Sequence, residues 1–196
     1  MSKRRQEQNQ EIQQGINDFE FQKNIRKKNS LTKSEFAKVN VQLSPKQHDL
    51  YKGIRNDILT VVHGPAGTSK TFTTCYTALA LLADKKVERI IITKPVQESG
   101  ENLGFLPGDM QEKLDPYIFP SYYLLNKIIG KTSREKLKEI EAIEVFALAF
   151  MRGMNIDNSI LIFEEAQNST PSQMKLLLTR IGYNSKFFIS GDLEQT

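Results

Sequence analysis

The amino-acid sequence predicts an α/β domain in which a mostly parallel sheet is covered by helices on both faces. Short runs rich in Val, Ile, Leu and Phe recur along the chain, and they alternate with segments of helical character. These runs are apolar at successive positions, which is typical of strands buried on both faces of a sheet. Strands of this kind, joined by helices, form parallel sheets.

The elements can be placed in chain order. Strands are expected at residues 58–62, 89–93, 143–148, 159–163 and 186–190. Helices are expected at residues 71–83, 109–130 and 133–139. Pro116 and Pro120 are expected to interrupt the second of these helices, because proline removes a helical hydrogen bond. Residues 95–108 contain several glycines and prolines and are expected to form a loop.

Two further helices share one start signal. A serine or threonine stands at the N-cap, a proline at the first helical position and a glutamine at the third. This pattern begins one short helix after Ser44 and another after Thr170. Gly182 ends the second of them.

The first 42 residues differ from the rest of the chain. They are rich in Gln, Asn, Lys and Glu and poor in apolar side chains, which predicts a flexible, polar and basic extension. Residues 1–45 hold 9 Lys or Arg and 5 Asp or Glu, whereas residues 46–196 hold 18 of each. The net charge of +4 therefore comes from the N-terminal quarter. A solvated, partly helical tail is favoured, and the alternative is an arm that contacts nucleic-acid phosphates.

Composition excludes several classes of protein. No stretch approaches the roughly 18 consecutive apolar residues of a membrane span, and the N-terminus lacks the apolar segment of a secretory signal. One cysteine and two histidines exclude a disulfide framework and a cysteine- or histidine-rich metal site. A cytoplasmic location is therefore expected. Cys75 is interpreted as a small buried residue rather than a nucleophile.

A glycine-rich segment stands between the first strand, expected to be buried, and the helix that follows it. It matches the phosphate-binding pattern G-x-x-x-x-G-K-[ST] except at one position. The predicted nucleotide-binding residues are Gly64, Pro65, Ala66, Gly67, Thr68, Ser69, Lys70 and Thr71. Backbone N–H groups of such a loop converge on phosphates at a helix N-terminus. Lys70 is expected to neutralise the β- and γ-phosphates, and the Thr71 hydroxyl to bind Mg²⁺.

Ser69 is the position that departs from the pattern, because it stands where the second glycine belongs. We expect a negative φ at Ser69, at the start of the helix, where a small side chain does not clash. Phosphate binding is therefore expected to survive the substitution. The alternative interpretation of the segment is an ordinary glycine-containing turn.

Later in the chain, the strand at residues 159–163 ends in two acids, Glu164 and Glu165. Acids at the end of a buried strand are costly unless they have a task such as metal binding. Glu164 is expected to support Mg²⁺, and Glu165 to polarise the attacking water. Glu164 stands where aspartate is usual, which bears on the geometry of the metal shell. The alternative is a pair of solvated acids.

Three more residues are candidates for contact with a nucleotide. Asp192 and Gln195 follow the last strand, at the sheet edge where ligands gather, and are expected to sense the γ-phosphate. Gln47 is placed upstream of the first strand, where its amide could read the adenine edge. Its position in the N-cap pattern is an equally good explanation.

A set of segments in order between residues 44 and 196 points to one family. They are residues 64–71, 93–109, 115–117, 151–153, 165–168, 173–176, 178–182 and 190–192. Residues 103–109, Leu-Gly-Phe-Leu-Pro-Gly-Asp, are especially specific, because general phosphate-loop physics does not require them. Together these segments resemble the PhoH-like ATPases, a phosphate-starvation-inducible family, in a member of phage or bacterial type.

The resemblance implies a RecA-like P-loop core related to superfamily 1 helicases. In that core the strand that ends at Ser190 lies between the two nucleotide-motif strands. The resemblance also implies ATP and Mg²⁺ as cofactors, ATP hydrolysis, and single-stranded nucleic acid as partner, RNA more than DNA. Homo-oligomeric rings without membrane association are expected. Residues 43–196 would form the ATPase domain, which is expected to be C-terminally incomplete after the Gly-Asp-x-x-Gln motif and to lack a later arginine.

Other candidates carry open alternatives. Thr93-Lys94-Pro95 matches a segment that faces the nucleic-acid backbone in related helicases, so Lys94 is a candidate phosphate contact or else a solvated loop lysine. Arg152 is a candidate phosphate sensor, although a surface arginine is favoured. An aromatic group could stack bases, although core packing is favoured at this helical spacing. Its members are Tyr117, Phe119, Tyr122 and Tyr123.

The function expected from the sequence is Mg-dependent ATP binding and hydrolysis coupled to the handling of single-stranded nucleic acid. The alternative is a nucleotide-responsive nucleic-acid-binding module with little turnover. Ser69, Glu164 and the missing arginine favour that alternative. A small-molecule kinase is disfavoured, because no lid or acceptor pocket is indicated and the paired acids suit water activation better.

Overall fold

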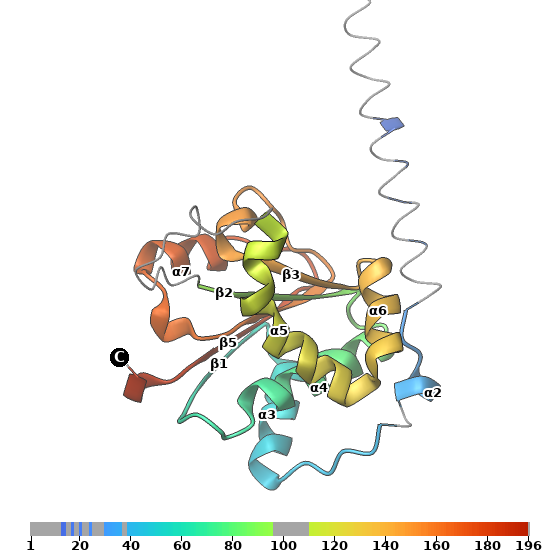
Figure 1. Ribbon diagram of the computed structural model, residues 1–196, viewed down its shortest axis with the longest axis horizontal. Coiled ribbons are helices and arrows are strands. Elements are labelled where there is room, and N and C mark those ends of the chain that lie inside the picture. Colours follow the sequence, from blue (N-terminus) through green and yellow to red (C-terminus); the bar gives the residue numbers. More distant parts are fainter. Residues whose placement is uncertain are drawn as a thin grey trace, which may run out of the picture.

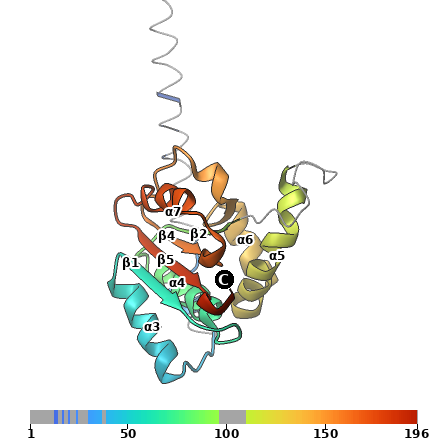
Figure 2. The same cartoon turned by 90° about the vertical axis from the view of Figure 1, so that its left-hand side faces the viewer.

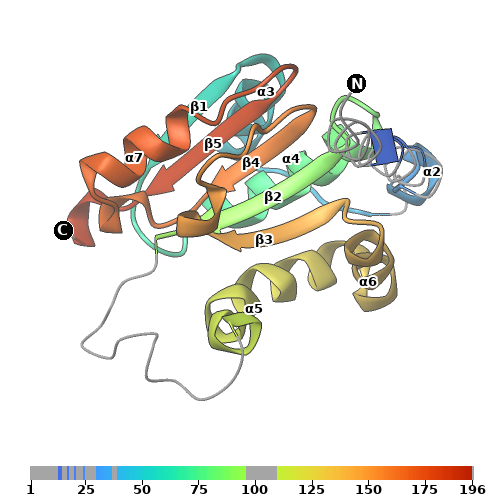
Figure 3. The same ribbon diagram turned by 90° about the horizontal axis from the view of Figure 1, so that it is seen from above.

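The centre of the computed structural model is a five-stranded sheet in which every neighbouring pair of strands is parallel (Figures 1 and 3). The structure describes residues 13, 14, 17, 20, 24, 30–36, 39–95 and 110–195, with the backbone alone at 110–118, 147, 149 and 195. The strands are β1 Leu59–His63, β2 Arg89–Lys94, β3 Ile143–Ala147, β4 Ser159–Phe163 and β5 Lys186–Gly191. The predicted parallel α/β fold is confirmed.

Helices connect these strands and cover both faces of the sheet; α7 lies on one side and α3 and α4 lie on the other (Figure 2). They are α2 Lys33–Phe36, α3 Pro45–Asn56, α4 Lys70–Ala83, α5 Met110–Ile129, α6 Lys131–Glu139 and α7 Pro171–Leu178. Short 3-10 turns follow three strands, at η2 Leu148–Met151, η3 Ala166–Asn168 and η4 Leu193–Gln195. No helix in the described ranges is long and apolar enough to cross a membrane.

The two predicted helix starts are confirmed, whereas the predicted interruption of a helix by proline is not. Ser44 and Thr170 each form a complete capping box with the glutamine three residues later. The prediction that two prolines interrupt the second long helix is wrong, since α5 is continuous from Met110 to Ile129.

The strand order is β1-β5-β4-β2-β3. β5 therefore lies between β1 and β4, the strands that precede the glycine-rich segment and the acid pair, as the resemblance implied. The expectation that the first strand is buried is wrong. β1 is an edge strand, and its Leu59 and Val61 side chains are 40% and 66% exposed. They share a sheet face with Phe187 and Ile189 of β5, but the buried cluster on that face extends only from β2 to β5.

Two apolar clusters hold the sheet between its helices. The larger lies between the sheet and α3, α4, α5 and α6, and it includes Leu79, Leu82, Ile92, Leu125, Ile162 and Phe188. The smaller lies under α7 and η2, and it includes Ile91, Met151, Leu161, Phe163 and Leu177. Cys75 is fully buried in the larger cluster, and burial raises the pKa of its thiol. This confirms its interpretation as a small core residue.

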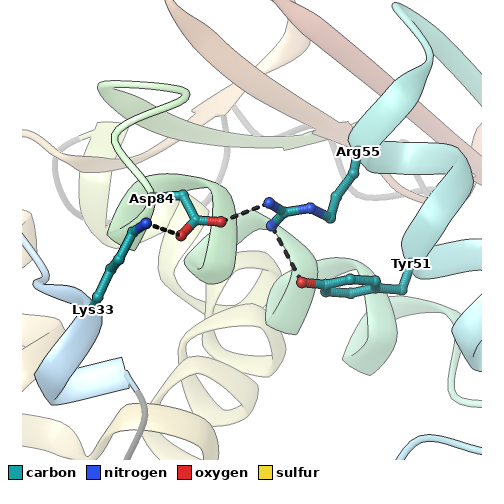
Figure 4. Close-up of polar contacts among 4 residues, drawn as sticks. All are labelled: Lys33, Tyr51, Arg55 and Asp84. Carbon is teal, nitrogen blue, oxygen red and sulfur yellow. Dashed lines mark hydrogen bonds and ion pairs between the residues drawn. The ribbon is translucent and has the colours of Figure 1, made fainter.

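A polar network joins three helices beside this core (Figure 4). Asp84, at the end of α4, accepts a hydrogen bond of 2.6 Å from Arg55 of α3 and pairs with Lys33 of α2 at 3.4 Å. Arg55 also donates to the Tyr51 hydroxyl at 3.2 Å. Burial opposes ionisation of Asp84, but the bonds from Arg55 and Lys33 outweigh it and lower the pKa of the carboxyl. The network fixes α3 alongside α4.

Candidate nucleotide-binding site

The candidate site lies where β1, β4 and β5 end. Because the strands are parallel, their carboxyl ends meet at one edge of the sheet, where α/β proteins bind ligands. A cavity of about 570 Å³ opens at this edge, within the range of small-ligand pockets. Its lining comprises residues 66–72 together with Gln42, Gln47, Leu124, Lys127, Glu165, Ser190, Gly191 and Asp192. Residues from distant parts of the chain thus surround one cavity.

The glycine-rich loop is held by its own polar contacts. Lys70 Nζ donates to the carbonyl oxygens of Gly64 and Pro65, at 2.5 and 2.9 Å. The Gly64 N–H donates to the Gly191 carbonyl at 3.3 Å, which ties the loop to the end of β5. Ser69, the N-cap residue of α4, makes no side-chain capping hydrogen bond. The first N–H groups of α4 therefore receive no bond from their N-cap side chain, and the residues of this turn line the cavity.

The backbone at Ser69 differs from the prediction. Its φ is +61° and its ψ is 26°, so Ser69 adopts the left-handed conformation and the predicted negative φ is wrong. The chain turns at Ser69 before α4 begins at Lys70. Glycine enters this conformation freely, whereas a residue with a Cβ pays about 1–2 kcal/mol. The glycine of the general pattern thus has a conformational reason, and Ser69 departs from it with strain.

Glu164 is nearly buried, with 8% of its surface exposed. Its Oε2 accepts a hydrogen bond of 3.2 Å from the Ser121 hydroxyl of α5. Within the described residues its Oε1 has no hydrogen bond of ordinary length and angle. Burial raises the pKa of this carboxyl; the Thr71 hydroxyl, the Lys94 charge and Ser121 oppose the rise, and the Glu165 charge adds to it.

The oxygens of Glu164 and Thr71 fit a Mg²⁺ ion. Both are hard oxygen ligands, and one buried carboxylate oxygen lacks a partner. Among the described residues, no group of three or more His, Cys, Asp or Glu could hold a metal by itself. Mg²⁺ in nucleotide sites typically takes one or two protein ligands and completes its shell with phosphate and water. The arrangement therefore suits a metal that arrives with a phosphate ligand.

Lys94 lies beside the acid pair. It is the last residue of β2, half-buried, rather than a solvated loop residue. Burial lowers the pKa of its ammonium, although the charges of Glu164 and Glu165 act to raise it. Lys94 thus supplies positive charge next to the candidate metal site, and its contact with nucleic acid stays a prediction.

Glu165 lies on the cavity wall in a strained conformation. Its φ is +55°, in the left-handed region that costs about 1–3 kcal/mol for residues other than glycine. Its Oε2 accepts a hydrogen bond of 2.6 Å from Gln167 Nε2, and Gln167 Oε1 accepts from the Asp192 N–H at 3.0 Å. Gln167 therefore links the ends of β4 and β5. The sequence patterns predicted no role for Gln167, although it stands within the segment 165–168.

Of the two acids that follow β5, Asp192 lines the cavity and Glu194 is exposed. Asp192 is buried, lines the cavity, and accepts a hydrogen bond of 3.1 Å from the Glu194 N–H, so it caps the short turn η4. Gln195 lies in the same turn, and its side chain is outside the described residues. Sensing of a γ-phosphate by these two residues stays a prediction.

Gln47 has the structural role that the sequence indicated. Its Oε1 accepts the Ser44 N–H at 2.8 Å, and its own N–H donates to the Ser44 hydroxyl at 3.4 Å. Gln47 also lines the cavity. The capping box engages the oxygen of its amide, so the Nε2 group is the part that can donate to a base. The two roles are compatible.

Comparison with known proteins shows the family of this chain. The family model described as PhoH-like protein matches residues 40–196. This chain belongs to the PhoH-like family. It is 47% identical over 141 residues to a PhoH-like protein of Bacillus subtilis (strain 168), which covers 72% of this chain and 44% of that protein.

Two further PhoH relatives have similar sequence identity to this chain and match a similar share of it. A PhoH-like protein of Synechocystis sp. is 44% identical over 151 residues, covering 77% of this chain and 46% of that one. Protein PhoH of Escherichia coli (strain K12) is 40% identical over 146 residues, covering 74% and 41%. The chain therefore spans under half the length of these PhoH relatives. The family is of P-loop ATPase type.

Not every predicted residue of this PhoH-like chain reaches the cavity. Arg152 is exposed, follows η2 after β3 at the sheet edge opposite β1, and is not part of the cavity lining. Residues 103–109, the most specific segment of the resemblance, lie outside the described residues. Conversely, Ser121, Leu124 and Lys127 were not predicted as site residues, since nothing in the sequence of α5 indicates that it lies beside Glu164 and the cavity.

The aromatic side chains of α5 divide between core and surface. Tyr122 packs against the core, and the Arg134 guanidinium lies 4.8 Å from its ring centre, as the core interpretation expected. That interpretation is wrong for Phe119 and Tyr123, which are 68% and 59% exposed. Among the described side chains of α5, Ser121, Leu125 and Ile128 are buried on one face, and these two residues lie on the other. The Tyr117 side chain is outside the described residues.

Proposed function

We propose that this chain binds Mg-ATP and hydrolyses it, and that hydrolysis is coupled to single-stranded nucleic acid, with RNA preferred over DNA. The observation that supports ATP as ligand is the meeting of three segments around one cavity. The glycine-rich loop, Glu165 after β4 and residues 190–192 at the end of β5 line it. Membership of a family of P-loop ATPase type supports the same proposal.

Binding would use groups that line the cavity together with the buried Glu164 carboxylate. The uncapped N–H groups at the start of α4 would receive phosphate oxygens. The Lys70 ammonium now donates to loop carbonyls and would donate to the β- and γ-phosphates instead. The Thr71 hydroxyl and Glu164 carboxylate would hold Mg²⁺, which supplies charge neutralisation when bound. Gln47 Nε2 would donate to the base.

Hydrolysis would rest on Glu165. Its carboxylate lines the cavity and is oriented by the bond from Gln167. It would accept a proton as a water oxygen forms a bond to the γ-phosphorus, while the bond between that phosphorus and the bridging oxygen of ADP breaks. Asp192 and Gln195 would sense the γ-phosphate that leaves.

Coupling to nucleic acid and assembly into homo-oligomeric rings are proposals that rest on the family resemblance. The position of Lys94 gives the coupling a physical route. A nucleic-acid phosphate that attracts the Lys94 ammonium would remove positive charge from beside Glu164 and Glu165. Contact at Lys94 would therefore alter the electrostatics of the metal site.

A second candidate function is a nucleotide-responsive nucleic-acid-binding module with little turnover. The strain at Ser69 favours it, since the loop carries a side chain where its backbone suits glycine. The engagement of Glu164 with Ser121 favours it as well, because one carboxylate oxygen is already occupied. Both features would leave binding intact and slow the chemical step.

The test is steady-state ATP hydrolysis with Mg²⁺, with and without single-stranded RNA, beside Lys70→Ala. Affinity for a fluorescent ATP analogue is measured on the same samples. If the enzyme proposal holds, Glu165→Gln loses turnover by a factor of 100 or more at unchanged ATP affinity. Under the module proposal, ATP binds and the unaltered chain shows no Lys70-dependent turnover. Absence of ATP binding would contradict both.

A further inference from the structure

Two aromatic side chains stand in solvent on the outer face of α5. The rings of Phe119 and Tyr123 are stacked, with centroids 6.5 Å apart and planes inclined by 26°. Their side chains are 68% and 59% exposed. Aromatic side chains bury large apolar areas in most proteins, so an exposed and mutually stacked pair indicates a surface that contacts something.

The two faces of α5 have different surroundings, one being buried and the other exposed. Ser121, Leu125 and Ile128 are buried on the inner face, where Ser121 donates to Glu164 of the candidate metal site. The outer face carries Phe119, Tyr123 and then Lys127, each four residues after the last. This spacing places the three side chains in one row along the helix. Lys127 lines the nucleotide cavity, so the row leads from the aromatic pair to the cavity wall.

The chain that follows this row carries an excess of basic residues, although Arg134 among them is only 11% exposed and lies over the Tyr122 ring. Between residues 119 and 139 the chain holds five basic side chains, at Lys127, Lys131, Arg134, Lys136 and Lys138. The acidic side chains in this stretch are Glu135 and Glu139. Residues 46–196 as a whole carry equal numbers of each sign, so the excess here is local. The exposed side chains that follow the aromatic pair toward α6 are Lys127 and Lys131, not apolar residues.

We propose that Phe119 and Tyr123 form a stacking platform for the bases of a single-stranded nucleic acid, with Lys127 and the exposed lysines of α6 contacting its phosphates. Aromatic faces beside basic side chains are the combination that binds single strands without sequence preference. An apolar protein segment would instead need apolar neighbours around the pair. The inference deepens the proposed function, on which it rests for its partner, by placing that partner on α5.

The test measures binding of a fluorescein-labelled oligouridine by the full chain, through fluorescence anisotropy without nucleotide. Phe119→Ala and Tyr123→Ala are each expected to weaken binding by about tenfold, and the double variant by more. Tyr123→Phe keeps the ring and is expected to bind like the unaltered chain. Tyr183→Ala is the matched control, because Tyr183 is 81% exposed and lies in the turn before β5. It is expected to leave affinity unchanged.

The salt dependence of strand binding tests the proposed contact between Lys127 and a phosphate. Lys127→Ala is expected to reduce the magnitude of the slope of log affinity against log salt by about the amount that one phosphate contact contributes. An oligothymidine of the same length distinguishes DNA from RNA, and binding of either strand at the platform supports the proposal. Circular dichroism melts of each variant confirm folding, since substitutions of exposed side chains rarely disturb it.

Three outcomes would overturn the proposal. They are absence of single-strand binding by the unaltered chain, equal affinity of the double variant, and a smaller oligomer in sedimentation of the double variant at unchanged strand affinity. The last would assign the pair to a contact between protein copies. ATP binding and RNA-independent hydrolysis, measured on the same variants, report on the proposed function separately. If the double variant lost strand affinity but still hydrolysed ATP without RNA, the proposed ATP hydrolysis would be unaffected.

Discussion

β1 precedes the glycine-rich loop of the candidate site and β4 precedes its acid pair, which is the metal half of the site. The environments of these two strands are opposite. β4 lies between β2 and β5, and all five of its residues are buried. β1 has β5 as its one neighbour among the described strands, and three of its five residues are exposed. The acid pair therefore follows a strand that is buried along its whole length, whereas the glycine-rich loop follows a partly exposed strand at the edge of the sheet. Similar apolar runs thus give the acid pair and the glycine-rich loop unequal mechanical support.

The largest expected effect contrasts the two strands directly. Phe163→Ala in β4 removes a fully buried ring next to Glu164 and is expected to lower the free energy of unfolding by about 3–5 kcal/mol. Val61→Ala in β1, where the side chain is 66% exposed, is expected to change it by less than about 0.5 kcal/mol. Urea unfolding followed by circular dichroism measures both. Equal losses would mean that the two strands are supported alike.

The next prediction concerns the metal half of the site. Glu164→Ala is expected to raise the Mg²⁺ concentration needed for half-maximal nucleotide binding by more than tenfold, because the carboxylate is lost. Ser121→Ala is expected to raise it by about tenfold, since Ser121 orients that carboxylate. Mg²⁺ titrations with a fluorescent ATP analogue measure both changes.

Ser159→Ala is the control for Ser121→Ala. Ser159 is a fully buried serine at the start of β4, the end of the strand away from Glu164, and it donates to the Asp157 carbonyl. Its loss is expected to leave the Mg²⁺ requirement unchanged. An equal shift in both serine variants would show that the Ser121 effect comes from general destabilisation of β4.

The loop half is tested by restoring the glycine. Ser69→Gly is expected to raise the free energy of unfolding by about 1 kcal/mol, because glycine relieves the left-handed strain. Ser133→Gly, within α6, is expected to lower it by about 0.5–1 kcal/mol, since glycine is unfavourable in a helix. Thermal unfolding distinguishes the opposite signs. A loss of stability in Ser69→Gly would refute the strain at the loop.

The smallest effect concerns the network that fixes α3 and α4 beside the edge strand. The pKa of Asp84 is lowered in the folded chain, so its ionised form stabilises the fold above the ordinary carboxyl pKa. That stabilisation is lost as the pH falls through this value toward the lowered one. Asp84→Asn is expected to cost about 1 kcal/mol or less at pH 7 and to make acid unfolding less steep.

Two controls accompany this prediction. Lys33→Ala removes the partner whose side chain is 75% exposed and is expected to have less effect than Arg55→Ala. Unfolding in urea at pH 3 and pH 7 measures each variant. If Asp84→Asn lost the same stability at both pH values, the contribution of the ionised carboxyl would be excluded.

Much of the candidate site could be predicted from local patterns. The loop at 64–71 and the acids Glu164 and Glu165 were recognisable because their spacing relative to strands and helices is part of their chemistry. The two N-cap patterns were recognisable because capping involves residues only three positions apart. The order in which β5 separates β1 from β4 followed from the family resemblance.

Other features were not predictable, because they depend on which surfaces meet. The conformation of Ser69 depends on how the loop turns into α4, which a residue type alone does not specify. Gln167 acquires its two bonds only when the ends of β4 and β5 lie side by side. Exposure of Val61 follows from the edge position of β1, and an apolar run has the same pattern in a central strand and at an edge.

Local sequence patterns are enough to predict the α/β class, the helix starts and the residues of the glycine-rich loop and acid pair, since each depends on neighbours along the chain. The place of α5 depends instead on how the whole domain packs. Its position brings Ser121 to Glu164, gives Lys127 a place at the cavity and leaves Phe119 and Tyr123 in solvent. Helical periodicity shows that a helix has faces, but packing against the rest of the domain selects which face is buried.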